Sequence, residues 1–342
     1  MNDAPLAVDT VDYHTGGEPF RIIVSGVPAL EGATILERRR FARERLDQIR
    51  RFLVFEPRGH ADMYGCHVVP PNDAGADLGV VFFHNEGYST ACGHGTIALV
   101  TWALETGVLP MTGPETPVTV DVPSGRLACV ARCDVAARRV TSVRFANVPS
   151  FVLATGVTLP TSRGLVTVDV AYGGAFYGSA DVRPLGLAVA KASLPVLIDL
   201  QRELRPALDA ALDVVHHEEP ELRDIYGITW WQDEPTAPGD DAALTQRNVT
   251  VFADGEVDRS PCGSGTSARL ALLHAAGRLR VGETLRHRSI VDSVFAGRVS
   301  GETAVAGRPA VITEVEGSAH LTGRSHFMLD PTDPLGLGFL LR

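Results

Sequence analysis

Hydrophobic and polar positions alternate over several short stretches in the first quarter of the chain. A period of two is typical of strands that bury one face, and turn residues separate these stretches. The pattern predicts strands at residues 6–11, 20–24, 52–55, 63–69 and 78–83. The charged segment 36–50 interrupts them and predicts a helix.

Two later segments are too apolar for surface helices, which predicts that they are buried. They cover residues 97–104 and 268–276 and are followed by Gly107 and Gly277, which are suited to end a helix. Each segment follows the same local sequence, Cys-Gly-x-Gly-Thr, beginning at Cys92 in the first copy and at Cys262 in the second. The two cysteines are therefore expected at equivalent helix starts.

The repeat extends beyond the two cysteine motifs. Hairpins are predicted after both apolar helices, at residues 118–130 and 290–300, and strands precede the helix in each half. A further long helix is predicted over 193–212, with Ser193 as its N-cap. This order indicates an internal duplication of an α/β unit, with one cysteine per half.

Composition excludes several classes of function. The chain of 342 residues is 45% hydrophobic and has a net charge of −10, and no basic stripe suited to nucleic acid or an anionic membrane surface is present. No segment predicts a signal peptide or a membrane span, and five cysteines fit reduced thiols, so a cytoplasmic protein is expected. His216 and His217 precede two glutamates, and a solvated face is expected there rather than a metal site.

The two cysteines predict acid and base chemistry. Free N–H groups and the helix dipole favour an anion at a helix start, and we expect them to lower the pKa of a thiol there. One thiolate and one thiol on opposite faces of a carbon atom can invert a stereocentre. The backbone N–H groups of Gly93, His94, Gly263 and Ser264 are expected to bind a substrate carboxylate.

No cofactor or metal is expected. Lys191 is the only lysine and ends an apolar segment, where a solvated side chain is more typical than a Schiff base with pyridoxal phosphate. A redox protein with a reversible Cys92 to Cys262 disulfide is an alternative, although no Cys-x-x-Cys motif is present. A non-catalytic amino-acid binding protein is another, but it needs no pair of thiols.

Five motifs together resemble the proline racemase family, in order and over essentially the whole chain. They are residues 11–19 (VDYHTGGEP), 56–60 (EPRGH), 84–88 (HNEGY), 92–95 (CGHG) and 258–265 (DRSPCGSG). The family includes proline racemases, hydroxyproline 2-epimerases and trans-3-hydroxy-L-proline dehydratases. The resemblance implies a fold like that of diaminopimelate epimerase, with two similar α/β domains and an active site between them. Each domain is a curved, mainly antiparallel sheet around a central helix, here 1–151 with 319–342, and 152–318.

The resemblance also implies roles for particular residues. His94 and Asp258 would hold the ring nitrogen and carboxylate of the substrate, and Tyr64 and Phe252 would form walls around the pyrrolidine ring. The implied partner is a small molecule, proline or a hydroxyproline, and a homodimer is left open.

The reaction type is less well defined by the sequence. The segments 63–65, 152–155 and 172–177 look closer to the dehydratase branch, and Ala175 stands where proline racemases usually carry asparagine. That branch typically carries threonine at the position of Cys262. Because epimerisation needs a second proton donor and elimination does not, a 2-epimerase of the 4-hydroxyproline type is expected. A trans-3-hydroxy-L-proline dehydratase and a proline racemase are the alternatives.

Overall fold

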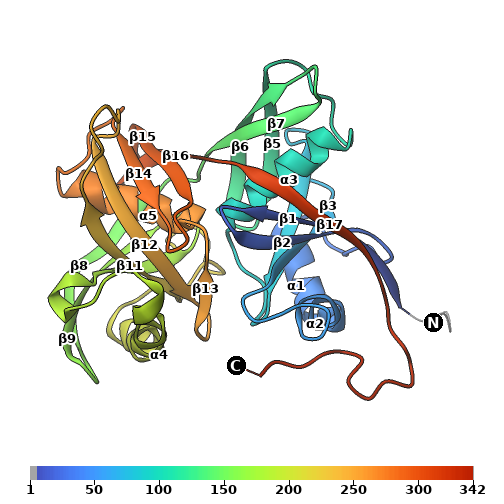
Figure 1. The fold of residues 1–342 in the computed structure, drawn as a ribbon, viewed down its shortest axis with the longest axis horizontal. Helices are drawn as coiled ribbons and strands as arrows, with labels where there is room; N and C mark the ends of the chain where they lie inside the picture. The colour runs from blue at the N-terminus through green and yellow to red at the C-terminus, as the bar shows by residue number, and fades with distance from the viewer. Residues whose placement is uncertain (1–5, 342) are drawn as a thin grey trace. The chain divides into compact units, whose positions relative to one another are not determined.

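The structure, a computed structural model, describes residues 6–341 and divides into two compact units. The first comprises Met1–Val143 with Ser318–Arg342, and the second comprises Arg144–Gly317. Both units consist mainly of antiparallel strands around few helices (Figure 1). The predicted mixed α/β class is therefore confirmed.

The first unit is a mostly antiparallel sheet, with helix α3 packed on it and with α1 and α2 in contact with strand β4. Strands pair in the order β17-β1-β2-β3-β4-β5-β6, and only the β2–β3 and β4–β5 pairs are parallel. Helix α3 contacts β1, β2, β3, β6 and β17. The bounds are β1 Ala7–Thr15, β2 Glu18–Ser25, α1 Ile35–Arg45, α2 Asp47–Val54, β3 Tyr64–Val69, β4 Leu78–His84, α3 Gly93–Glu105, β5 Glu115–Val122, β6 Gly125–Asp134, β7 Arg139–Ala146 and β17 Ala319–Met328.

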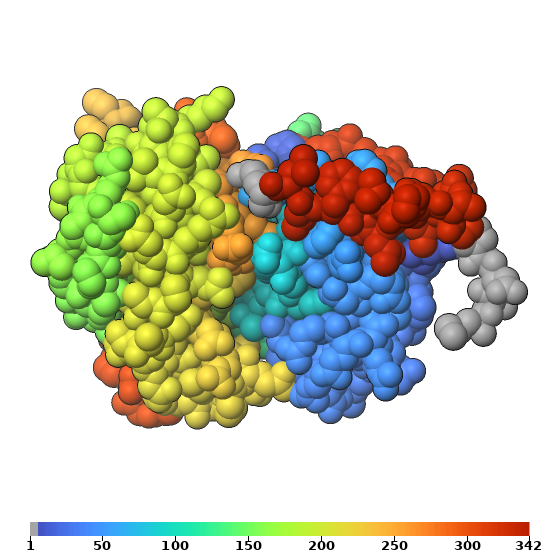
Figure 2. Space-filling model, turned by 90° about the horizontal axis from the view of Figure 1, so that it is seen from below, coloured from blue at the N-terminus to red at the C-terminus, as the bar shows by residue number. Residues whose placement is uncertain are grey.

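The C-terminal segment returns to this unit. Strand β17 pairs with β1, and Phe339 forms a β-bridge with Glu56. In Figure 2 the red C-terminal residues lie over the blue N-terminal ones. Arg58 contributes to this contact by donating a hydrogen bond to the carbonyl of Gly336. Segments from both ends of the chain thus form one unit.

The second unit repeats this plan around helix α5. Strands pair in the order β8-β9-β10-β11-β12-β14-β15-β16, with parallel β10–β11 and β12–β14 pairs, and β13 adds to β12. Helix α5 contacts β8, β9, β10, β15 and β16, whereas α4 packs on β8, β11 and β12. The bounds are β8 Phe151–Thr161, β9 Gly164–Tyr172, β10 Phe176–Asp181, α4 Leu194–Ala211, β11 Ile225–Glu234, β12 Leu244–Phe252, β13 Glu256–Asp258, α5 Gly263–Ala275, β14 Thr284–Arg288, β15 Val294–Val305 and β16 Arg308–Gly317.

The two apolar helices match their sequence-based predictions. Cys92 is the N-cap of α3 and Cys262 the N-cap of α5, and nearly every residue of both helices is buried. Gly107 and Gly277 follow the helix ends with φ of 79° and 67°, a left-handed conformation that glycine adopts without strain. No helix within residues 6–341 has the length and apolar character that crossing a membrane requires.

Three local predictions were wrong. Residues 52–55 belong to α2 and its C-cap rather than to a strand, because α2 buries an apolar face in the core of the first unit. The predicted helix 36–50 is broken at Leu46 into α1 and α2. The hairpin predicted within residues 290–300 instead turns at 289–293, between β14 and β15, and residues 294–300 belong to a single strand. Helix α4 begins as predicted, but the Ser193 side chain makes no capping hydrogen bond.

Gly173 sets how closely α5 approaches the sheet, and its replacement tests this packing. A Cβ at Gly173 would lie 2.3 Å from the carbonyl oxygen of Ser264 and 2.6 Å from the nitrogen of Ala268. Because both are backbone atoms of the α5 segment, Gly173→Ala must displace the helix. We expect a loss of about 1–3 kcal/mol in the free energy of unfolding, measured by chemical denaturation. Gly301→Ala is the matched control, since its Cβ meets no atom within 4 Å; equal stability of both variants would contradict the expectation.

Candidate functional site

The start of α3 places the sulfur of Cys92 against the first turn of the helix. Its Sγ accepts a hydrogen bond from the N–H of Gly95 at 3.3 Å. The ring nitrogens of His94 lie 3.5 and 3.6 Å from the same sulfur. A Cβ at Gly95 would lie 2.6 Å from Sγ, so only glycine leaves room for this contact.

His94 is held by aromatic rings and by the backbone. Its ring meets Tyr64 edge to face at a centroid distance of 4.9 Å, and Phe20 at 5.7 Å. The hydroxyl of Thr15 donates to the His94 carbonyl at 2.9 Å, and the Tyr64 hydroxyl donates to Ser89 at 2.5 Å. Burial lowers the pKa of His94 to about 3, so its ring is neutral at physiological pH and can accept a hydrogen bond.

The start of α5 holds Cys262 in a different local geometry. Cys262 has a φ of 62°, which is uncommon for a residue with a side chain, whereas Cys92 is extended with a φ of −153°. The Ser260 hydroxyl accepts from the N–H of Cys262 at 3.1 Å, and Asp258 accepts from the N–H of Ser260 at 2.8 Å. These two bonds fix the 258–262 loop. A Cβ at Gly265 would lie 2.9 Å from the Cys262 sulfur, as in the first copy.

The electrostatics of this second cysteine contradict the sequence-based expectation. We expected the helix start to lower the pKa of the thiol, but burial raises the pKa of Cys262 and the charge of Asp258 raises it further. Burial also raises the pKa of Asp258 to about 6. Hydrogen bonds at the helix start act in the opposite direction and are outweighed. Cys262 is therefore a thiol at neutral pH.

Each unit brings together part of the predicted site. Cys92, Gly93, His94 and Tyr64 are neighbours in the first unit, and Cys262, Gly263, Ser264 and Asp258 are neighbours in the second. Phe252 lies on β12, where its ring stacks on Tyr226 at 5.3 Å. Tyr226 in turn meets Tyr177 edge to face, and the Tyr177 hydroxyl lies 3.8 Å from the Cys262 sulfur.

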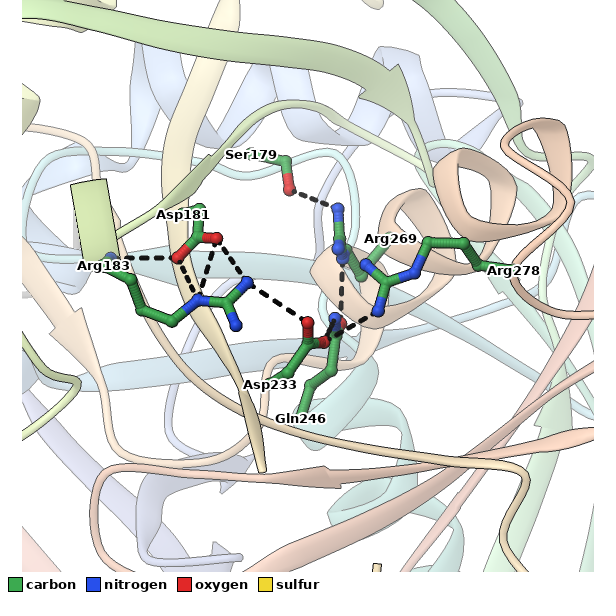
Figure 3. Close-up of polar contacts among 7 residues, drawn as sticks. All are labelled: Ser179, Asp181, Arg183, Asp233, Gln246, Arg269 and Arg278. Carbon is green, nitrogen blue, oxygen red and sulfur yellow. Dashed lines mark hydrogen bonds and ion pairs between the residues drawn. The ribbon is translucent and has the colours of Figure 1, made fainter. Parts of the chain in front are cut away.

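Sequence reasoning missed Arg269, the residue that ties α5 to its sheet. The side chain is buried and stacks on the ring of Trp231 at 3.7 Å. Its guanidinium donates to Gln246 at 2.9 Å and to Ser179 at 3.3 Å (Figure 3). Burial lowers the pKa of Arg269 to about 9, so it remains charged at neutral pH.

Acidic residues around Arg269 extend this network. Gln246 donates to Asp233 at 2.7 Å, and Asp233 also accepts from Arg278 and Arg183 (Figure 3). The network thus joins α5 to β10, β11 and β12 through side chains only. Because α5 begins at Cys262, these bonds also fix the position of that cysteine. A charged residue within an otherwise apolar helix was the sequence signal for such a role.

No metal site is found among residues 6–341: no three His, Cys, Asp or Glu side chains there are placed to share an ion. The expectation that His216 lies on a solvated face was wrong. Its ring is buried, and it packs against Phe151 and Tyr172 at centroid distances of 5.6 and 4.8 Å. His216 therefore belongs to the aromatic core of the second unit, whereas His217 is exposed.

A comparison with family models identifies the relatives of this chain. The model of proline racemase matches residues 10–340. The chain belongs to the proline racemase family. The matched range includes both cysteine motifs of this chain.

Named relatives in the proline racemase family carry two kinds of activity. The chain is 50% identical to a trans-3-hydroxy-L-proline dehydratase of Burkholderia ambifaria and to a 3-hydroxyproline 2-epimerase of Burkholderia multivorans, each over 98% of both chains. It is also similar to the crystal structure of a hydroxyproline epimerase from Agrobacterium vitis with bound trans-4-hydroxy-L-proline. The TM-score is 0.90 at 33% identity, covering 98% of this chain and 96% of the other.

Buried histidines predict that acid destabilises the protein. Burial lowers the pKa of His67 to about 4 and of His94 and His287 to about 3. The unfolded chain binds protons at these residues below about pH 6.5 and the folded chain does not, so stability falls as the pH falls. Asp258 opposes this because its pKa is raised. We expect a net loss of about 3 kcal/mol in the free energy of unfolding between about pH 6.5 and 5, measured by urea denaturation.

Two variants separate this effect from general acid sensitivity. His67→Phe should flatten the pH dependence of stability, because it removes one buried imidazole. A phenylalanine can replace this ring, since His67 packs edge to face on Phe83 and its Nε2 has no hydrogen-bond partner among the described residues. His217→Gln, at an exposed position, should leave the pH dependence unchanged. Stability that is constant over this range would refute the prediction.

Proposed function

We propose that the protein is a cofactor-independent hydroxyproline 2-epimerase that uses Cys92 and Cys262 as its two proton-transfer groups. The observation that carries this proposal is the pair of cysteines at the starts of two buried helices, each with glycine three residues later. Membership of the proline racemase family supports a proline derivative as the substrate. Epimerisation at Cα needs one base and one acid on opposite faces, and two thiols provide both.

The different surroundings of the two sulfurs support distinct resting states. Both sulfurs are buried and accept an N–H hydrogen bond from the glycine three residues later, but Cys92 lies beside a neutral imidazole, whereas the charge of Asp258 favours the protonated form of Cys262. We propose that Cys92 acts as the base toward the L-substrate and Cys262 as the acid. Their roles are exchanged after each turnover, since the proton lost at one face is replaced from the other.

The helix starts also support stabilisation of the intermediate. Loss of the Cα proton places negative charge on the substrate carboxylate, and the first N–H groups of α3 and α5 lack partners within their own helices. We propose that the N–H groups of Gly93, His94, Gly263 and Ser264 bind this carboxylate, with Asp258 accepting a hydrogen bond from the ring nitrogen. Tyr64 and Phe252 would contact the ring on its apolar edges.

A trans-3-hydroxy-L-proline dehydratase is the second candidate. The 50% identity to an enzyme of that name from Burkholderia ambifaria favours it. Dehydration requires one strong base and a departing 3-hydroxyl, so the second thiol would be unnecessary. Cys262 therefore favours the epimerase, as does the equal identity to the Burkholderia multivorans epimerase. The Agrobacterium vitis structure, with bound trans-4-hydroxy-L-proline, is consistent with a 4-hydroxy substrate.

Proton NMR in deuterated water distinguishes the two reactions. The purified protein is incubated separately with trans-4-hydroxy-L-proline, trans-3-hydroxy-L-proline and L-proline, with no added cofactor. We expect deuterium at Cα and the C2 epimer from the 4-hydroxy substrate, epimer rather than water loss from the 3-hydroxy substrate, and little reaction of proline. Turnover of the 3-hydroxy substrate alone, with loss of water, would establish the dehydratase instead.

Serine replacements test the two-thiol mechanism. Cys92→Ser and Cys262→Ser should each lower the rate of epimerisation by at least about 10²-fold, because a hydroxyl is a far weaker acid and base than a thiol. Exchange of the α-proton from one enantiomer is expected to survive better in one variant than in the other, since that half-reaction needs one base. Cys133→Ser is the control, because Cys133 lies on β6 outside both helix starts. Full activity of Cys262→Ser would exclude Cys262 from the reaction.

A further inference from the structure

We propose that Tyr177 is a positioning residue for Cys262: its hydroxyl links the Cys262 sulfur to the Ser264 hydroxyl in a chain of hydrogen bonds that can reverse direction. This inference rests on the proposed function, because it assigns Cys262 two protonation states during turnover. Tyr177 ends the segment 172–177, which resembles the dehydratase branch, but neither the sequence pattern nor the family resemblance gave its side chain a role in the site.

The geometry that supports this role lies within the second unit. The Tyr177 Oη lies 2.7 Å from the Ser264 Oγ and 3.8 Å from the Cys262 Sγ. All three side chains are buried. Tyr177 comes from β10, whereas Cys262 and Ser264 form the start of α5. One phenol therefore contacts two side chains at the start of α5.

The strand pattern explains why β10 can do this. Successive side chains of a strand point to opposite faces, so Tyr177 and Ser179 share one face. Tyr177 contacts the start of α5, and Ser179 accepts a hydrogen bond from Arg269 further along the same helix. Strand β10 thus holds α5 at two points. One is Arg269 within the helix, and the other is the Cys262 sulfur at the N-terminal end of the helix.

A phenol suits both states of the cysteine because it can donate or accept. When Cys262 is a thiol, its S–H donates to Tyr177 and the phenol donates to Ser264. When Cys262 is a thiolate, the phenol donates to the sulfur and accepts from the Ser264 hydroxyl. The second arrangement is the stronger one, because a hydrogen bond to an ionised acceptor exceeds one between neutral groups. Tyr177 therefore favours the thiolate.

The other groups around Cys262 both oppose and favour its thiolate, and the Tyr177 hydroxyl adds to the second set. Asp258 on β13 opposes ionisation of the thiol by its charge, and Arg259 beside it favours the charged form of Asp258. The Thr250 hydroxyl on β12 and the Gly265 N–H on α5 favour the thiolate, as the Tyr177 hydroxyl does. Without the phenol, burial and Asp258 would be opposed by one hydroxyl and one N–H.

Tyr177→Phe isolates the hydroxyl, since it removes one oxygen and keeps the ring that packs on Tyr226. The readout is the rate of alkylation by iodoacetamide between about pH 6 and 10, followed by mass spectrometry of the peptides that contain Cys262 and Cys92. We expect the alkylation rate of Cys262 to fall about tenfold at a given pH, which corresponds to a rise of about one unit in the pKa of its thiol. The alkylation rate of Cys92 should not change.

Tyr172→Phe is the matched control. Tyr172 is also a buried tyrosine, but its hydroxyl has no hydrogen-bond partner among the described residues and its ring packs on Phe151 and Phe176. The Tyr172→Phe variant should leave the alkylation rates of Cys262 and Cys92 unchanged. The pH dependence of kcat/KM provides a second comparison that needs no reagent to enter the site. In Tyr177→Phe, the apparent pKa that Cys262 contributes to this pH profile should rise by about one unit.

The outcomes for the two proposals are separable. Wild-type behaviour of Tyr177→Phe in both measurements would overturn the role of Tyr177, whatever reaction the enzyme catalyses. An equal shift at Cys92, or in Tyr172→Phe, would also overturn it, because the effect would then be structural. Full activity of Cys262→Ser would instead refute the proposed function. The alkylation rates of the Tyr177→Phe protein would still decide whether Tyr177 affects the ionisation of Cys262.

Discussion

The contact between a cysteine sulfur and the first turn of a buried helix is the constraint on which the rest of this structure depends. In both units the glycine three residues after the cysteine leaves room for that sulfur, since a Cβ would lie 2.6 Å from Cys92 and 2.9 Å from Cys262. The helices are apolar because sheets surround them, and this burial keeps the sulfurs away from bulk water. The same burial makes an ionised thiol costly unless neighbouring groups stabilise it.

The two copies meet this requirement differently. Cys92 is an extended N-cap whose sulfur accepts from Gly95 and lies beside an imidazole that burial keeps neutral. Cys262 has a positive φ and lies near a carboxylate that disfavours its ionisation. The two copies of the motif thus place their sulfurs in different surroundings, and such a difference suits a reaction in which one group starts as a base and the other as an acid.

The means of fixing each helix also differ between the copies. In α5 a buried arginine stacks on Trp231 and donates to Gln246 and Ser179, whereas Leu99 occupies the equivalent place in α3 and packs by apolar contact alone. A buried guanidinium loses its hydration, and its hydrogen bonds and the aromatic ring only partly replace it. The hydrogen bonds of this arginine to β10 and β12 are directional, so they fix the position of α5 along the sheet. Apolar packing alone constrains that position less.

The sequence by itself determined the features that depend on local chain geometry. It predicted both cysteine helices with a cysteine at each start and a glycine after each end, and most of the strands of the first unit. These features follow from periodicity and backbone preferences, which act over a few residues. It failed at 52–55, where an apolar run fits a short strand and an amphipathic helix equally well. Only the tertiary structure decided that Tyr177 meets Cys262 and that Arg269 ties α5 to the sheet, since these partners are distant in sequence. It alone also decided that burial raises the pKa of Cys262, because desolvation depends on all the segments packed around a group.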